Sequence, residues 1–192
     1  MSRIRDWIVS VPTAAAFGLV LGIGDVVQRV TFRMGMGPYE RALGSLHRWL
    51  IRAFRIAGVR VIPDSMDGIE DRGGYIVISN HQSMFDISIY GALLAGHTPR
   101  FVSKRSLAKG IPTVSFYLKH GGNALIDRGD REQAMEAIKE MGVLCQERGK
   151  AAVIYPEGTR SRDGSLGDYR IAGASALMEA APGLPVLPAV ID

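Results

Sequence analysis

Cysteine is nearly absent from the sequence, and so are the short motifs of several common enzyme classes. Cys145 is the only cysteine among the 192 residues, so no disulfide can form within the chain, and a reducing compartment is the simpler expectation. The patterns CxxC, HExxH, GxGxxG and GxxxxGK(S/T) do not occur. Zinc-dependent, dinucleotide-binding and P-loop chemistries therefore have no support in the sequence.

Acidic side chains are scarce in the first third of the chain. Residues 1–60 contain nine arginines and only three acidic residues, a net charge of +6, whereas the remaining 14 basic and 16 acidic residues leave −2 for residues 61–192. A protein that binds nucleic acid is expected to carry its positive charge on its main body, so this distribution disfavours nucleic acid as a partner. The hydrophobic share of 47% excludes intrinsic disorder, because it supplies ample apolar surface to bury.

Charge of either sign is missing from residues 7–24, WIVSVPTAAAFGLVLGIG. This run of 18 residues is close to the ~20 that a helix needs to cross a bilayer. Pro12 and Thr13 lower its hydrophobicity, so both a spanning helix and a helix lying in the membrane interface stay open. No small-x-small cleavage site follows the run, which favours an uncleaved anchor over a signal peptide. The remaining alternative is an apolar helix packed on a soluble domain.

A second helix is predicted between residues 39 and 57. Apolar positions recur there at helical spacing, and the arginines at 48, 52 and 55 share another face. Such a basic amphipathic helix fits an anionic membrane surface, although a solvated face against the protein core is an equal alternative for this segment alone. Positive charge after the apolar run predicts that the rest of the chain stays on the cytoplasmic side of the membrane.

Beyond residue 58, short runs typical of strands alternate with helical patterns. Strands are predicted at 59–62, 75–79, 101–103, 124–126, 152–155 and 186–191. Helices are predicted at 86–95, 112–119, 131–148 and 172–180. This order indicates an α/β fold with a central, largely parallel sheet flanked by helices. We therefore divide the chain into a membrane-associating helical segment, residues 1–57, and an α/β domain, residues 58–192, with an ordinary surface loop at 63–74.

Three polar clusters follow predicted strands, where ligands of parallel sheets gather. They cover residues 79–86, 126–128 and 155–161. In the first, Asp86 can accept a hydrogen bond from one nitrogen of His81, so that the other nitrogen can act as a base. A purely structural pair, in which Asp86 caps a helix and His81 bonds to backbone, is the alternative.

The second and third clusters contribute Arg128 and Arg160, whose guanidinium groups match phosphate oxygens. Two convergent arginines suggest an anionic substrate group. A surface salt bridge is the alternative, above all for Arg128 beside Asp127 and Asp130. The sequence Glu157-Gly158-Thr159 suits a tight turn around a small polar ligand.

Together these clusters resemble a known family. NHQSMFD is similar to the NHxxxxD block and YPEGTRS to the (F/Y)PEGTRS block of the glycerolipid acyltransferases, the family that contains 1-acyl-sn-glycerol-3-phosphate acyltransferase. GGNALIDR resembles the arginine-bearing block between them, and residues 183–190 resemble the proline-bearing fourth block. The resemblance covers roughly residues 60–191 and implies the glycerolipid acyltransferase fold for the α/β domain.

The resemblance also implies a role for each matching residue. His81 would be the general base that deprotonates the acceptor hydroxyl, and Asp86 would orient it. Asn80 would shape the turn, and Lys104 would assist with phosphate charge. The acceptor site would be built by Arg128, Glu157, Gly158, Thr159 and Arg160. No metal and no cofactor is expected, because the acyl group arrives on acyl-CoA or acyl-carrier protein as a co-substrate.

The implied reaction is transfer of a fatty acyl group to lysophosphatidic acid, giving phosphatidic acid at an anionic membrane. One alternative keeps the reaction and changes the acceptor, for example to a lyso-ornithine lipid or another lysophospholipid. Two further alternatives are a hydrolase and a non-catalytic membrane-binding module. The chain departs from the family pattern at Arg170, which stands where a lysine is usual. Members also usually continue beyond the fourth block, so we expect either further chain after Asp192 or an unusually short member of the family, with an uncovered sheet edge.

Overall fold

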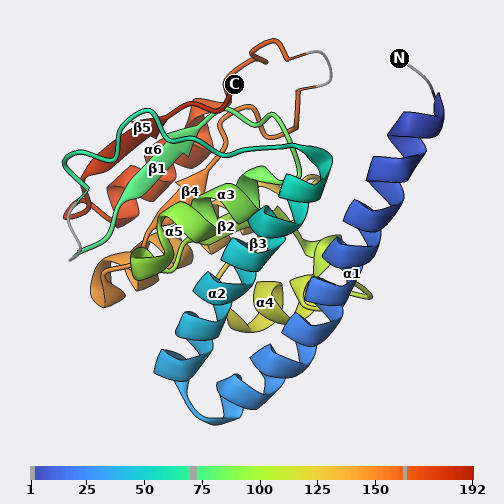
Figure 1. Cartoon of the computed structure of the whole chain (residues 1–192). Helices are drawn as coiled ribbons and strands as arrows, with labels where there is room; N and C mark the ends of the chain where they lie inside the picture. Colours follow the sequence, from blue (N-terminus) through green and yellow to red (C-terminus); the bar gives the residue numbers. More distant parts are fainter. Residues whose placement is uncertain (1–2, 70–72, 162–163) are drawn as a thin grey trace.

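A five-stranded sheet forms the centre of the computed structural model, which describes residues 3–69, 73–161 and 164–192 (Figure 1). The strand order is β3-β2-β4-β1-β5, and every pairing is parallel. The strands are β1 (Ile76–Ser79), β2 (Arg100–Lys104), β3 (Ala124–Ile126), β4 (Ala152–Ile154) and β5 (Val186–Ala189). The predicted α/β fold with a parallel sheet is confirmed.

Helices connect the strands, as the alternating pattern predicted. They are α3 (Asp86–Leu93), α4 (Val114–His120), α5 (Arg131–Arg148) and α6 (Ile171–Ala180), together with the short 3-10 turns η1 (Arg55–Ala57), η2 (Ala95–His97) and η3 (Arg105–Ala108). The longest, α5, has a clear signal at each end. The Asp130 carboxylate accepts the Gln133 N–H at 3.0 Å, and Gly149 ends the helix with a left-handed φ of 60°.

The two faces of the sheet bury two different hydrophobic clusters. On one face Val77, Phe101 and Val153 pack with residues of α2, α3 and α4. On the other face Ile76 and Ile154 pack with α5 and α6. Successive strand residues point to opposite faces, so a sheet covered on both sides needs apolar residues throughout, which explains the lack of strict alternation in the sequence.

The predicted strand at residues 59–62 is wrong. This stretch follows η1 as irregular chain, and Val59 and Ile62 are 50% and 80% exposed. Both neighbours of β1 are already occupied, by β4 on one side and β5 on the other. The run has strand propensity but finds no strand to pair with. Of the predicted surface loop at 63–74, residues 70–72 lie outside the described part of the chain.

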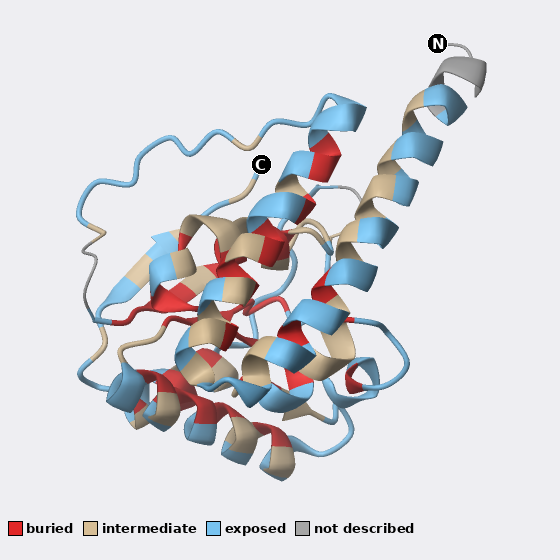
Figure 2. Cartoon of the chain, turned by 60° about the horizontal axis from the view of Figure 1, so that its bottom comes forward, coloured by how far each residue is buried: buried red, intermediate tan, exposed pale blue. Residues whose placement is uncertain are grey.

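Two long helices, α1 (Arg3–Arg33) and α2 (Met36–Phe54), form an antiparallel hairpin beside the sheet (Figure 1). The segment Trp7–Arg33 is long and apolar enough to cross a membrane, and only 6% of its most apolar window is buried. Figure 2 shows the N-terminal part of α1 projecting from the body with mostly exposed residues. The alternative of an apolar helix packed on a soluble domain along its whole length does not fit this exposure.

The hairpin nevertheless shares the core of the body. Tyr39 and Leu43 of α2 belong to the same buried cluster as Val77 and Phe101. The arginines predicted on the other face of this helical segment, at positions 48, 52 and 55, are exposed. The boundary between residues 57 and 58 stays a prediction, and the packing joins the two segments on either side of it.

Candidate active site

The loops after β1 and β4 lie side by side because these two strands are neighbours in the sheet. Ile78 pairs with Ile154, and the strands run in parallel, so their carboxyl ends meet at one edge. The first loop carries the NHQSMFD sequence and the second carries YPEGTRS. Residues some 75 positions apart in the chain are thereby brought into hydrogen-bond contact, as the bond between His81 and Glu157 shows.

His81 and Asp86 form the hydrogen-bonded pair that the sequence predicted. Nδ1 of His81 lies 2.8 Å from Oδ2 of Asp86, which is fully buried as the first residue of α3. The same oxygen accepts the backbone N–H groups of Gln82 and Ser83 at 2.8 and 2.9 Å. An oxygen that already accepts two amide N–H groups acts as the acceptor toward His81 as well, which assigns the donor role to Nδ1. Nε2 is then free to accept a proton.

The YPEGTRS loop holds His81 from the other side. Oε1 of Glu157 accepts the backbone N–H of His81 at 2.8 Å, and the backbone N–H of Ser161 donates to the His81 carbonyl at 2.8 Å. The ring of Tyr155 stacks on the imidazole, with centroids 4.2 Å apart and planes inclined by 14°. The residue is fixed at its backbone, at Nδ1 and at one ring face.

The carboxylate of Glu157 is buried and accepts backbone hydrogen bonds. Only 5% of the residue is exposed, and its second oxygen accepts the backbone N–H of Gly167 at 3.1 Å. The carboxylate thus joins three segments of backbone, and a direct contact with an acceptor stays a prediction. Gly158, next in the chain, adopts a left-handed φ of 66°, a conformation that favours glycine.

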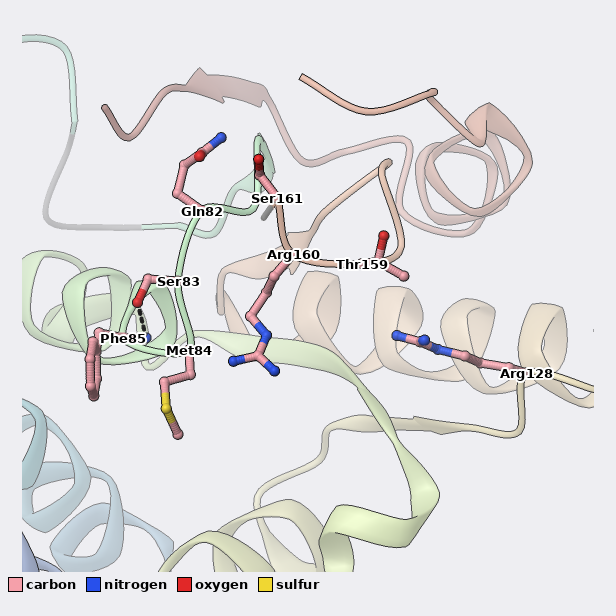
Figure 3. Close-up of a pocket in the computed structure, with 8 residues that line it drawn as sticks. All are labelled: Gln82, Ser83, Met84, Phe85, Arg128, Thr159, Arg160 and Ser161. Carbon is pink, nitrogen blue, oxygen red and sulfur yellow. Dashed lines mark hydrogen bonds between the residues drawn. The ribbon is translucent and has the colours of Figure 1, made fainter. Parts of the chain in front are cut away.

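A pocket of about 470 Å³ opens beside this pair of loops (Figure 3). Three predicted site residues line it, namely Arg128, Thr159 and Arg160. The other five lining residues were not singled out from the sequence, and they are Gln82, Ser83, Met84, Phe85 and Ser161. The five missed residues lie inside the two matched blocks, so their position in the loops was the available signal. Gln82 and Ser161 connect this lining to His81, the first as its chain neighbour and the second by a backbone hydrogen bond.

The two arginines of the pocket come from different loops. Arg128 follows β3, and its Nη2 donates to the carbonyl of Gly158 at 2.7 Å. Figure 3 shows the guanidinium of Arg160 pointing into the space between the loops. Within the described residues neither arginine forms an ion pair, so the alternative of a salt bridge from Arg128 to Asp127 or Asp130 is not observed. The pocket therefore offers two cations to an anionic group.

The other predicted residues lie around the pocket. Asn80 is buried, and its amide pairs with both backbone groups of Ile191, at 2.7 and 2.8 Å, so it fixes the chain after β5 to the first loop. Lys104 is exposed at the end of β2 and is not part of the pocket lining. Arg170 is exposed too, with its backbone N–H donated to Pro156. Their roles toward a ligand stay predictions.

Comparison with known proteins gives this arrangement a family. A protein-family model described as "Acyltransferase" matches residues 53–192. The chain belongs to the acyltransferase family. The resemblance proposed from the sequence blocks is thereby confirmed, and the match contains every predicted site residue.

Several relatives of this acyltransferase-family chain carry one activity in their names. A chloroplastic 1-acyl-sn-glycerol-3-phosphate acyltransferase of Brassica napus is 28% identical over 182 residues, which is 90% of this chain and 51% of the relative. The 1-acyl-sn-glycerol-3-phosphate acyltransferase of Escherichia coli is 32% identical over 123 residues, 64% of this chain and 49% of the relative. The chain spans about half the length of these two relatives.

A solved structure supports the fold of this family member. The crystal structure of the 1-acyl-sn-glycerophosphate (LPA) acyltransferase PlsC from Thermotoga maritima aligns with a TM-score of 0.77 at 25% sequence identity. The alignment covers 98% of this chain and 74% of that chain, so it includes the helical hairpin as well as the sheet.

Proposed function

We propose that this protein transfers a fatty acyl group from an acyl thioester to the free hydroxyl of 1-acyl-sn-glycerol-3-phosphate, giving phosphatidic acid. The observation that carries the proposal is the His81–Asp86 pair beside a pocket lined by two arginines that form no ion pair with a described residue. A base and an anion-binding site next to each other suit an acceptor that carries both a hydroxyl and a phosphate. The names of the relatives support the same acceptor.

In this reaction Nε2 of His81 takes the proton of the acceptor hydroxyl while the hydroxyl oxygen attacks the carbonyl carbon of the thioester. The new C–O bond forms, the C–S bond breaks, and the thiolate leaves and is protonated. Asp86 keeps the imidazole in the required tautomer and stabilises its charged form. Arg128 and Arg160 bind the phosphate, and charge-assisted hydrogen bonds to such a group contribute about 1.5–3 kcal/mol each.

We place the reaction at the cytoplasmic face of a membrane that contains anionic lipids. The exposed apolar side chains of α1 and the exposed arginines of α2 would hold the protein at the surface in which its lipid acceptor is dissolved. The acyl donor would be acyl-CoA or acyl-carrier protein, since the mechanism requires only a thioester.

The test is thiol release from acyl-CoA, and separately from acyl-carrier protein, by the protein in mixed micelles. Release should depend on lysophosphatidic acid and fall by about 10²–10⁴-fold in His81→Ala. Arg128→Gln should raise the KM for lysophosphatidic acid by roughly 10-fold or more, because it removes one charge-assisted contact. Arg131→Gln is the matched control, since Arg131 is an exposed arginine at the start of α5 outside the pocket lining.

Three outcomes would contradict the proposal. Equal release in His81→Ala would remove His81 from its role. Release without any acceptor would indicate a hydrolase. A better rate with a lyso-ornithine lipid or lysophosphatidylcholine than with lysophosphatidic acid would keep the chemistry and change the acceptor.

A further inference from the structure

Tyr155 is the one ring stacked on His81 in the described structure, and its position is set by the core. It is the first residue after β4, only 9% exposed, and it belongs to the buried cluster that contains Val153 and Tyr90. A ring packed in this way is a rigid surface. The imidazole lies on it almost in parallel, at 4.2 Å and 14°.

The hydrogen bond to Asp86 leaves one motion of the imidazole open. A single contact at Nδ1 fixes the direction of that nitrogen but allows the ring to tilt about the Nδ1···Oδ2 line. Tilting would move Nε2, the atom that must receive the proton, away from the acceptor hydroxyl. A flat ring against one face of the imidazole prevents the tilt, and the backbone contacts from Glu157 and Ser161 hold the two loops in register.

The ring of Tyr155 also affects the charged form of His81. When His81 takes a proton it becomes a cation, and a cation over the face of an aromatic ring is stabilised by the negative potential of that face. The phenol itself stays neutral, because burial raises the pKa of Tyr155 well above its ordinary value. Its hydroxyl has no hydrogen-bond partner among the described residues, so only the ring contributes.

We propose that Tyr155 is a positioning residue for acyl transfer, whose ring fixes the plane of the His81 imidazole and stabilises the imidazolium that forms during the reaction. The inference rests on the proposed function, in which His81 is the base. It assigns the effect to the aromatic face and not to the hydroxyl. The hydroxyl should therefore be dispensable, although it is the polar part of the side chain.

The test compares Tyr155→Phe, which keeps the ring, with Tyr155→Leu and Tyr155→Met, which keep an apolar side chain without a ring. We expect kcat with lysophosphatidic acid to fall by about 10-fold in the Leu and Met variants, with the acceptor KM unchanged, and to stay within about twofold in the Phe variant. Phe101→Leu is the matched control for loss of a core ring, because Phe101 lies in the same cluster, contacts the ring of Tyr117 edge-on and makes no ring contact with His81 among the described residues. It should lower the melting temperature without lowering kcat.

A second measurement does not depend on activity. An aromatic ring stacked on His81 shifts the ring proton resonances of that histidine upfield, and the resonances can be assigned by comparison with His81→Ala. The upfield shift should persist in Tyr155→Phe and disappear in Tyr155→Leu or Tyr155→Met. A purely structural role would lower the stability of the Leu and Met variants and leave the kcat of folded protein unchanged.

The two proposals fail in distinguishable ways. If the wild-type protein releases thiol and the folded Leu or Met variant matches Tyr155→Phe in kcat, the role of Tyr155 is wrong and the function stands. If the wild-type protein shows no acceptor-dependent release, the proposed function fails and the role of Tyr155 in acyl transfer falls with it. If the upfield shift is equal in all variants, the stacking itself is wrong.

Discussion

Apolar side chains differ in exposure between the α/β body and the hairpin of α1 and α2. In the body both faces of the sheet are covered, so that Val77, Ile76 and Val153 are at most 1% exposed. On α1, Leu19 and Val26 are 64% and 62% exposed. Large apolar surfaces without a protein partner are typical of contacts with membranes or other molecules. The body buries its apolar side chains, whereas α1 presents many of its apolar side chains outward.

One face of α1 is not exposed but contacts the body. Phe17 of α1 contacts both Phe54 of α2 and Phe85, with ring centroids 5.5 and 5.8 Å apart, and Phe54 and Phe85 lie 4.2 Å apart. Phe85 lines the pocket and directly precedes Asp86. One face of α1 therefore packs against the loop that carries the proposed catalytic pair.

A second contact joins α1 to the loop before α4. Thr113 has a φ of 65°, rare for a residue with a branched side chain, and the N–H of Val114 donates to the Pro112 carbonyl across it at 2.6 Å. The strained turn is supported by α1, since Asp25 accepts the Thr113 N–H at 2.7 Å and the Leu21 carbonyl accepts its hydroxyl at 2.6 Å. The hairpin is thus part of the structure around the site.

The largest expected effect comes from removing the hairpin. Deleting residues 1–57 removes four core side chains of α2, each at most 7% exposed: Tyr39, Leu43, Leu46 and Leu50. Losing a buried side chain of this size costs about 2–5 kcal/mol, so four exceed or match the roughly 5–15 kcal/mol that stabilises a whole domain. We expect no cooperative thermal transition in circular dichroism.

Deleting residues 1–14 is the matched shorter truncation. Residues 7–14 are exposed or half-buried, so this protein should fold and keep a cooperative transition. A cooperative transition in residues 58–192 alone would instead make the hairpin a separable domain, as the predicted boundary implies.

The outward face of α1 can be tested without disturbing the core. The double variant Leu19→Asp, Val26→Asp should lose about 100-fold or more in affinity for vesicles of phosphatidylcholine and phosphatidylglycerol. Two exposed apolar side chains no longer enter the membrane, at about 1.5–3 kcal/mol each, and two carboxylates are repelled by anionic lipid. Flotation of the vesicles measures the loss.

A control of the same chemistry lies on the body. Val143→Asp with Met178→Asp changes two exposed apolar side chains of α5 and α6, on the opposite face of the sheet from the hairpin. It should leave vesicle binding unchanged. Equal losses in the two double variants would show that the outward face of α1 has no special part in membrane contact.

A pH effect is expected where the hairpin meets the body. His47 of α2 is buried against Gly91 of α3, and burial lowers its pKa to about 4 from the model-peptide value of 6.5. The unfolded chain then binds more protons than the folded protein between these two values, so stability is lost as the pH falls below 6.5. From pH 7 to pH 5 we expect a loss of about 1–2 kcal/mol from this residue.

Urea unfolding in a non-ionic detergent at the two pH values measures this loss. The variant His47→Gln should lose less stability between pH 7 and pH 5 than the wild-type protein by that same amount. An equal pH dependence in the two proteins would mean that His47 is not buried as a neutral group.

Local signals in the sequence predicted some elements closely and misjudged others. Helix α5 begins and ends as predicted, because Asp130 and Gly149 mark its limits by their own conformational preferences. The run at 59–62 has the composition of a strand but pairs with no strand, and both sides of β1, the next strand along the chain, are occupied. Pairing is decided by the whole sheet, which no local pattern describes.

The same distinction holds for the site. His81 and Asp86 lie on one connection, so a short spacing was enough to predict their contact. The stacking of Tyr155 and the anchoring role of Glu157 depend on β1 and β4 being neighbours, which is a property of the strand order. Phe17 is also far from the loop in sequence, and its apolar character alone predicted membrane contact.

The smallest effect should come from the inward face of α1. Phe17→Leu removes a ring contact on Phe85, and such contacts contribute about 0.5–1.5 kcal/mol, so kcat should fall roughly 3–10-fold while vesicle binding stays unchanged. Leu19→Ala, two residues along the same helix, should weaken vesicle binding and leave kcat unchanged. If Phe17 acts through Phe85, Phe17→Leu should lower kcat less in a protein that already carries Phe85→Leu than in the wild-type protein. Multiplicative losses in the double variant would mean that the two rings act independently, and that α1 serves only as an anchor.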